Sequence, residues 1–426
     1  MTYKKTKGVL LPISALPGAG PTGDLDGAPE FVSWLRTNGF STWQVLPLSP
    51  PDRYGSPYSS WASFAGYPAY IGLRWLASQG LSDPEIPKTL EPWVNHKLTS
   101  GPKLEAVLEA AERLVHDKRH PLHEQMASFG SNSPWARHAA MFSARKERHK
   151  GKHWWQWPAG ESFEHSGNEL SQRETIWLAA FFLFEAQYAE VKAYAANNGV
   201  EMIGDLPLYP AHDSADVWAN RGLFQLAVNG QCLNIAGVPP DDHFKEGQVW
   251  GNPLYEWPNH KQGGFTWWLQ RINRALKLYD RLRLDHFIGF SRYWSIPVKT
   301  GSIGSANGQW IAAPGDDLFD KLLKIVPPER FIAEDLGALD DATMALRDRY
   351  RLPGTKVAIF GFHDNDQREN PHRLEDLQPN SILYSSTHDT DTIKGWWESL
   401  CERDRRATGL GSNSEETHME LMNRVE

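Results

Sequence analysis

The sequence is poor in cysteine and contains no long apolar run. Its 426 residues include only two cysteines, Cys232 and Cys401, which form neither a CxxC pair nor a zinc-binding pattern. Isolated cysteines indicate free thiols in a reducing compartment, so we expect a cytoplasmic protein. No segment approaches the roughly 20 apolar residues of a membrane helix, and we therefore expect no membrane partner.

Excess positive charge and clusters of metal ligands are also missing. The chain has 44 basic and 52 acidic side chains, which gives a net charge of −8. Because contacts with phosphate dominate nucleic-acid binding, this balance argues against a general nucleic-acid partner. The 16 histidines include no HExxH motif and no close cluster, so we expect no metal site.

Tryptophan, by contrast, is abundant, with 19 residues. Indole rings can stack on the apolar face of a sugar, but composition alone favours a large aromatic core as the explanation. A basic stretch at 145–152 precedes Trp154, Trp155 and Trp157. We interpret it as a solvated helix end followed by a packed aromatic turn, rather than as a nucleic-acid site.

Short apolar runs alternate with helical patterns, which predicts a parallel α/β sheet or barrel. Asp26 and Pro29 are expected to cap and open the first helix, and 174–197 is expected to form a long amphipathic helix. We divide the chain into barrel segments at 1–80 and 171–426, an inserted helical subdomain at 81–170, and a lid and subdomain insertion at about 208–260. The seven predicted strands are Gly8–Ser14, Thr42–Leu48, Glu201–Leu206, Arg281–Phe287, Arg330–Asp335, Lys356–Phe360 and Ile382–Ser386.

Charged or polar residues follow several of these strands at the same end. In a (β/α)8 barrel the active site lies at the carboxyl ends of the strands. Each such residue could instead cap a helix or start a turn. Their recurrence on successive strands favours a shared site, made by Asp205, Asp285, Glu334 with Asp335, and His388 with Asp389.

Paired carboxylates at such a site are typical of retaining glycoside chemistry. One carboxylate acts as the nucleophile, and one carboxylic acid protonates the leaving oxygen. In Arg283-Leu284-Asp285, the two charged residues point to the same face of a strand because they lie two positions apart. The arginine would keep the aspartate ionised, which favours Asp285 as the nucleophile and leaves Glu334 as a candidate acid.

Ten sequence motifs, in order and over nearly the whole chain, resemble one family. They are LLPISALPG, WQVLPLSP, SPYSSWASFAG, IGDLPLYPAHDSADVW, AGVPPD, GQVWGNPLYEW, RLDHFIGF, IAEDLG, LPGTKV and THDTDT. The chain resembles the amylomaltases, or disproportionating enzymes, which are the 4-α-glucanotransferases of glycoside hydrolase family 77. The resemblance implies a (β/α)8 barrel with inserted helical subdomains, which acts on α-1,4-glucans such as maltodextrin and needs no cofactor.

The resemblance also implies a role for each matching residue. It makes Asp285 the nucleophile, Glu334 the general acid/base and Asp389 the stabiliser of the transition state. It places Tyr58, Asp205, Arg283 and His388 in the donor subsite. In the GQVWGNP segment it makes Trp250 a lid residue over bound glucan, with Asn252 and Pro253 beside it as substrate-binding residues.

Several positions depart from the family pattern. Thr390 replaces an asparagine, Tyr67 replaces another, and an aromatic residue of the lid is displaced to Phe244. These changes leave acceptor preference and the ratio of transfer to hydrolysis open. The family also continues to an eighth strand, which we do not find in this sequence, so we expect a barrel with an open edge. Whether the chain is a fragment, and what its oligomeric state is, stay open.

Two other functions fit the same residues. A nucleophilic carboxylate paired with a carboxylic acid fits an α-amylase-type hydrolase equally well, although the SPY and GQVWGNPLYEW motifs favour a transferase. A non-catalytic glucan-binding remnant is the alternative that the absent eighth strand suggests.

Overall fold

A seven-stranded parallel sheet organises the protein. The computed structural model describes residues 5–18, 22–83, 101–163, 167, 169–240, 245–298, 304–337, 339–362, 370–408, 410 and 413–425. All seven predicted strands are present; β3 has the predicted bounds, the others end earlier than predicted, and β9, β10 and β11 also begin at different residues. In spatial order they are β1 (Gly8–Leu10), β2 (Thr42–Gln44), β3 (Glu201–Leu206), β6 (Arg281–Leu284), β9 (Phe331–Ala333), β10 (Gly354–Val357) and β11 (Ser381–Tyr384).

The sheet curves so that distant strands face each other across its interior. The Tyr384 hydroxyl on β11 donates to the Gln44 Oε1 atom on β2 at 2.6 Å, although four strands separate β2 from β11 in the sheet. In the described part of the chain, β1 and β11 are the end strands. The strands therefore form a barrel with an open edge, as predicted.

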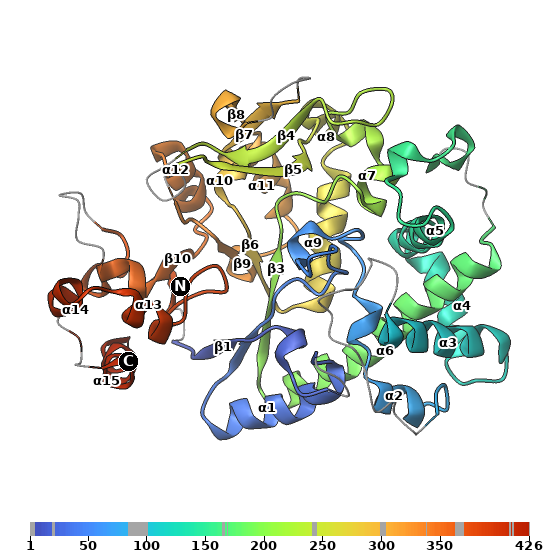
Figure 1. Cartoon of the computed structure of the whole chain (residues 1–426), viewed down its shortest axis with the longest axis horizontal. Coiled ribbons are helices and arrows are strands. Elements are labelled where there is room, and N and C mark those ends of the chain that lie inside the picture. Colours follow the sequence, from blue (N-terminus) through green and yellow to red (C-terminus); the bar gives the residue numbers. More distant parts are fainter. Residues whose placement is uncertain are drawn as a thin grey trace.

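A smaller antiparallel sheet, which we did not predict, stands beside the first one (Figure 1). In spatial order it contains β5 (Gln248–Pro253), β4 (Asn234–Val238), β7 (Arg292–Pro297) and β8 (Gln309–Ala312). Glycine, asparagine and proline within β4 and β5 lower their strand propensity and conceal them in the sequence.

Helices follow most of the parallel strands and cover the sheet. The helices outside the region 81–170 are α1 (Ala28–Thr37), α2 (Leu73–Ser78), α6 (Gln172–Asn197), α7 (Ala215–Ala219), α8 (Trp257–Gln262), α9 (Thr266–Leu278), α10 (Ile288–Ser291), α11 (Gly315–Leu322), α12 (Asp341–Arg349), α13 (Ile393–Ser399), α14 (Glu402–Thr408) and α15 (Ser414–Val425). The helices α13 and α15 share a small core of their own with the end of β10, and it includes Trp396, Trp397 and Leu421. Figure 1 shows α13, α14 and α15 grouped at one side of the molecule.

The described part of region 81–170 is helical, with α3 (Pro102–His116), α4 (His123–Asn132) and α5 (Pro134–Arg148). All three helices pack against α6. Our expectation that 174–197 is amphipathic is therefore wrong for its first half, because every residue of Ile176–Phe184 is buried. A helix that packs against other helices on one side and a sheet on the other needs no polar face.

Two local predictions need correction. Asp26 does not cap α1; its carboxylate accepts the amides of Arg74 and Trp75 at 3.0 and 3.3 Å, at the start of α2. The basic stretch at 145–152 is not wholly solvated either, since Arg145 and Lys146 are buried. They are buried because acidic partners, Glu174 and Asp213, lie at hydrogen-bonding distance. The aromatic turn after them is packed as predicted, with Trp154 and Trp157 buried.

Both cysteines are free, as expected. None of the helices in the described ranges is long and apolar enough to cross a membrane. Most tryptophans in the described ranges lie in the core, which agrees with a large aromatic core as the explanation of their number.

Candidate active site

The predicted site residues come together at the carboxyl ends of the parallel strands. Asp205 lies on β3 and Arg283 on β6, while Asp285 and Glu334 directly follow β6 and β9. Tyr58 lies in a short helical turn after β2, and His388 follows β11. Because parallel strands place their carboxyl ends at one edge of the sheet, residues far apart in sequence meet there.

A buried arginine joins two of the carboxylates. The Arg283 Nη1 atom donates to Asp205 Oδ1 and Oδ2 at 2.9 and 2.8 Å and to Asp285 Oδ1 at 2.7 Å. The side chains of Arg283 and Asp205 are 4% and 0% exposed, whereas that of Asp285 is 25% exposed. The buried pair thus forms the floor of the site, and Asp285 is the carboxylate that solvent or a ligand can reach.

Tyr58 links the floor to the strand end on the other side of the barrel. Its hydroxyl donates to Asp205 Oδ2 at 2.8 Å and lies 2.6 Å from His388 Nε2. A tyrosine hydroxyl has one proton, so the donor in the second contact is the histidine N–H. The Tyr58 and His388 rings stack with centroids 5.4 Å apart. Burial lowers the pKa of His388, so the imidazole is neutral at neutral pH.

Glu334 is held by backbone amides instead of a cation. The amides of His286 and Leu336 donate to its Oε2 and Oε1 atoms at 2.7 and 3.1 Å. Burial raises the pKa of Glu334 to about 8; Arg283 opposes this rise and the negative charge of Asp285 adds to it. Burial also raises the pKa of Asp285, to about 7, against the charge and direct hydrogen bond of Arg283. Because the bond from Arg283 stabilises the ionised form of Asp285, Glu334 is the carboxyl group that is protonated more readily.

The other predicted residues lie around this centre. Asp389 is 68% exposed and lies 3.2 Å from His388 Nε2. Trp250 reaches the site through His286, with ring centroids 4.7 Å apart. Asn252 donates to the Pro210 carbonyl at 3.0 Å. Pro253 is buried and pairs with Ile235 of β4, so these last two residues contact the protein itself.

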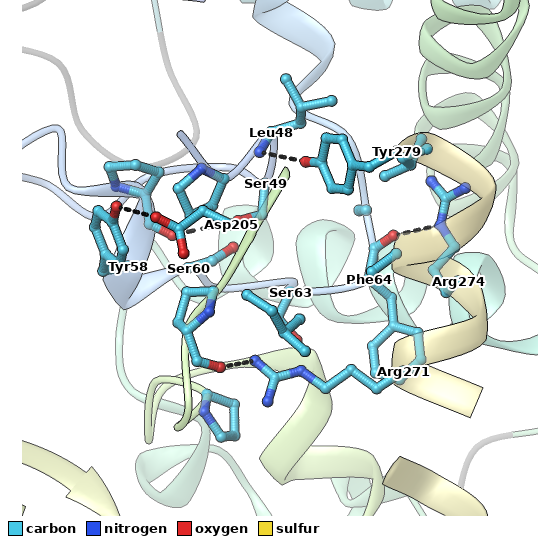
Figure 2. A pocket seen from close by; sticks show the side chains of 18 of the residues that line it. Leu48, Ser49, Tyr58, Ser60, Ser63, Phe64, Asp205, Arg271, Arg274 and Tyr279 are labelled. Atoms are coloured by element: carbon cyan, nitrogen blue, oxygen red, sulfur yellow. Dashed lines mark hydrogen bonds between the residues drawn. The ribbon is translucent and has the colours of Figure 1, made fainter. Parts of the chain in front are cut away.

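A small cavity lies behind Asp205 (Figure 2). Its volume of about 30 Å³ could hold roughly two water molecules. Figure 2 shows Tyr58 and Asp205 at one end of it and Tyr279, Arg274 and Arg271 at the other. The Tyr279 ring packs so closely on Gly204 that a Cβ there would lie 2.0 Å from it, which explains the glycine before Asp205.

His286 is a residue of the site that sequence reasoning missed. It has φ 52°, in the left-handed region that residues with a Cβ rarely adopt. Nothing in the sequence marks this conformation; its position directly after Asp285 is the one available signal. Among the described residues, no group of three or more His, Cys, Asp or Glu side chains could hold a metal ion.

Known proteins of one family match this chain. A family model described as 4-alpha-glucanotransferase matches residues 11–425. The 4-alpha-glucanotransferase of Aquifex aeolicus is 39% identical over 412 residues, which cover 94% of this chain and 82% of that protein. The chloroplastic/amyloplastic 4-alpha-glucanotransferase of Solanum tuberosum is 37% identical, with 94% and 72% covered.

The solved structures agree with the sequence matches. The amylomaltase of Streptococcus agalactiae in complex with acarbose superposes with a TM-score of 0.87 at 31% identity, over 95% of this chain and 83% of that one. The amylomaltase of Corynebacterium glutamicum, at 17% identity and a TM-score of 0.74, covers 98% of this chain and 59% of its own and shares the fold.

Proposed function

The chain belongs to the 4-alpha-glucanotransferase family, glycoside hydrolase family 77, and from this premise we propose that it transfers segments of α-1,4-glucans by a retaining double displacement. The donor is a maltooligosaccharide, and the acceptor is the 4-hydroxyl of another glucan or of glucose. The acarbose complex of the Streptococcus agalactiae amylomaltase supports an α-glucan as the ligand.

The contrast between Asp285 and Glu334 carries the assignment of roles. Asp285 accepts a hydrogen bond from Arg283 at 2.7 Å, and an adjacent positive charge favours the ionised carboxylate that a nucleophile requires. Within the described ranges, backbone amides and no cation donate to the Glu334 carboxyl, and its burial favours the protonated form that a general acid requires. Two carboxyl groups that differ in this way in their hydrogen-bond donors can divide the acid and nucleophile roles.

In the first step, an Asp285 oxygen attacks the anomeric carbon of the donor sugar and forms an ester bond. The glycosidic C–O bond breaks, and the leaving oxygen takes the proton of Glu334. The remainder of the donor leaves with a new hydroxyl. Asp389, at the edge of the site, would stabilise the positive charge that develops on the sugar ring.

In the second step, the acceptor replaces the leaving chain. Its 4-hydroxyl attacks the anomeric carbon, Glu334 takes the hydroxyl proton, and the ester bond to Asp285 breaks. Two inversions return the α configuration. Transfer also requires that a sugar reach the ester before water does, and a lid that includes Trp250 would exclude water from the site.

The remaining polar groups fit a donor subsite. Tyr58, Asp205 and His388 form one hydrogen-bonded set beside the nucleophile, and such preorganised groups can bind sugar hydroxyls without rearranging. Asn252 and Pro253 would support substrate binding indirectly, because they lie on the strand that carries Trp250. The contact of Asn252 with Pro210 and that of Pro253 with Ile235 hold this strand in place.

Incubation with maltotriose tests the proposal. We expect glucose together with a ladder of longer oligosaccharides, and we expect Asp285→Asn to abolish both products. Asp317→Asn on α11, which removes an exposed carboxylate paired with Lys261, is the matched control and should leave the product pattern unchanged. Shorter sugars alone would indicate a hydrolase. A protein that maltodextrin stabilises against heat, but that releases no product, would be a glucan-binding remnant.

A further inference from the structure

His286 has a strained backbone conformation, and this conformation directs two backbone amides toward Glu334. His286 has φ 52°, and the next residue, Phe287, returns to φ −57° and ψ −30°. A left-handed residue followed by a right-handed one turns successive amide groups toward the same side, which is the arrangement that binds anionic oxygen atoms in proteins. Here both amides converge on Glu334: His286 N–H binds its Oε2 atom at 2.7 Å and Phe287 N–H binds its carbonyl at 3.0 Å.

The side chain of His286 contacts the lid tryptophan. Its ring meets the Trp250 indole edge to face, with centroids 4.7 Å apart and planes at 82°. Trp250 belongs to β5, and its indole N–H donates to Gln248 Oε1 on the same strand at 2.9 Å, which also restrains the indole. Burial lowers the pKa of His286 to about 4, and the ring is therefore neutral when Glu334 works. Within the described ranges, the imidazole has this ring contact and no hydrogen bond.

We propose that His286 is a positioning residue that couples the lid to the acid/base: its ring seats Trp250, and its left-handed backbone aligns the carboxyl of Glu334. The inference rests on the function proposed above and assigns a residue to it. The imidazole holds the Trp250 indole over the site, so the lid excludes water while Glu334 activates the acceptor. Without the ring the indole would be held less firmly, and water would reach the ester more often. His286 therefore favours sugar acceptors over water.

Replacements at position 286 separate the ring from the backbone. His286→Gly keeps the left-handed turn and its amide but deletes the ring, so hydrolysis should gain about three-fold or more on transfer, the range of one aromatic pair. His286→Phe restores a ring, and Phe265 shows that this chain accommodates phenylalanine at φ 60°. It should return the ratio toward the wild-type value.

His286→Val tests the backbone half. A β-branched residue disfavours positive φ, so the amide should move away from Glu334. Loss of a hydrogen bond to the carboxylate should lower kcat by about ten-fold or more, with a smaller effect on KM. It should also move the alkaline limb of the pH profile to higher pH, because that bond lowers the pKa of Glu334. Arg283 and Asp285 on β6 also act on this pKa, and the substitution leaves both in place.

Controls distinguish this role from general damage. Arg351 is exposed, lies between α12 and β10, and also has a left-handed φ of 54°, so Arg351→Val causes the same backbone conflict elsewhere. It should lower Tm without changing the product ratio or the pH limb. Trp250→Leu should raise the hydrolysis share, and adding His286→Gly to it should raise that share no further.

The possible outcomes distinguish failure of the proposed function from failure of the role of His286. Wild-type protein that makes no longer oligosaccharides from maltotriose would overturn the proposed function, and this inference with it. Wild-type protein that transfers, together with a His286→Gly variant of unchanged transfer-to-hydrolysis ratio, would overturn the coupling alone. An unchanged alkaline limb in His286→Val would overturn the backbone role; if that variant does not fold, His286→Ala, which is smaller but still disfavours positive φ, takes its place.

Discussion

Replacing Arg283 by methionine is the most informative single perturbation of the site. Methionine has similar length and no charge, so Asp205 would remain fully buried without its cation and Asp285 would lose its strongest partner. Removing one member of a buried ion pair typically costs about 3–5 kcal/mol. Two opposite charges about 4 Å apart attract by about 4 kcal/mol at an effective dielectric constant of about 20. We expect the free energy of unfolding to fall by about 4 kcal/mol, because protonation of the stranded carboxylates relieves part of a larger cost.

The same substitution should change the pH profile in a defined direction. Arg283 lowers the pKa of Asp285, so its removal raises that pKa and reduces the ionised fraction of the nucleophile. The loss of activity should therefore be greatest at acidic pH and smaller as pH rises. Release of glucose from maltotriose between about pH 5 and pH 9, together with urea unfolding at neutral pH, measures both effects.

A second variant makes the reasoning refutable. Arg283→Met combined with Asp205→Asn removes the fully buried negative charge that the single substitution strands. The double variant should therefore recover part of the lost stability, and the cycle should be clearly non-additive. A loss below about 1 kcal/mol in the single variant, or an unchanged acidic limb, would show that the arginine does not hold the two aspartates as their distances indicate.

Other predictions follow from the same contacts. Glu334→Gln should raise Tm relative to wild type more at about pH 8.5 than at pH 5. The pKa of Glu334 is raised from 4.5 to about 8, so the stability that its protonated form contributes is fully present below pH 4.5 and is lost as pH rises through 8. Equal Tm shifts at both pH values would contradict this. Tyr58→Phe should lower kcat/KM for maltotriose by about ten-fold to a hundred-fold, because Asp205 loses a charged hydrogen bond and His388 loses its acceptor; a change below two-fold would remove Tyr58 from the donor subsite. Lys103→Met should lower the free energy of unfolding in urea by about 3 kcal/mol, because it leaves the Asp24 carboxylate without its cation. That carboxylate is 0% exposed and lies 2.5 Å from the lysine. Adding Asp24→Asn should restore much of the lost stability, and no recovery would indicate lost packing instead.

The sequence by itself determined the parallel strands and the end of the sheet at which the candidate site residues gather. Apolar runs such as Phe331–Ala333 are local patterns, and the charged residue that follows, here Glu334, can be noticed without knowledge of the fold. The pair Arg283 and Asp285 could also be placed on one face, because side chains two positions apart on a strand point the same way. The family motifs supplied roles for these residues, which the patterns alone did not.

Tertiary structure alone decided which of these residues touch. Tyr58 and His388 are separated by 330 positions, and their contact exists because the sheet curves until strand ends that are not neighbours face each other. The burial of Ile176–Phe184 on all sides arises in the same way, since three helices from another part of the chain cover α6. The left-handed φ of His286 was equally hidden, because contacts with Glu334 and Trp250 compensate for an unfavourable local conformation. The secondary-structure preference of a segment can be inferred from neighbouring residues in the sequence. The curvature of the sheet, the helices that cover α6 and the backbone strain at His286 depend on segments that only the folded chain brings together.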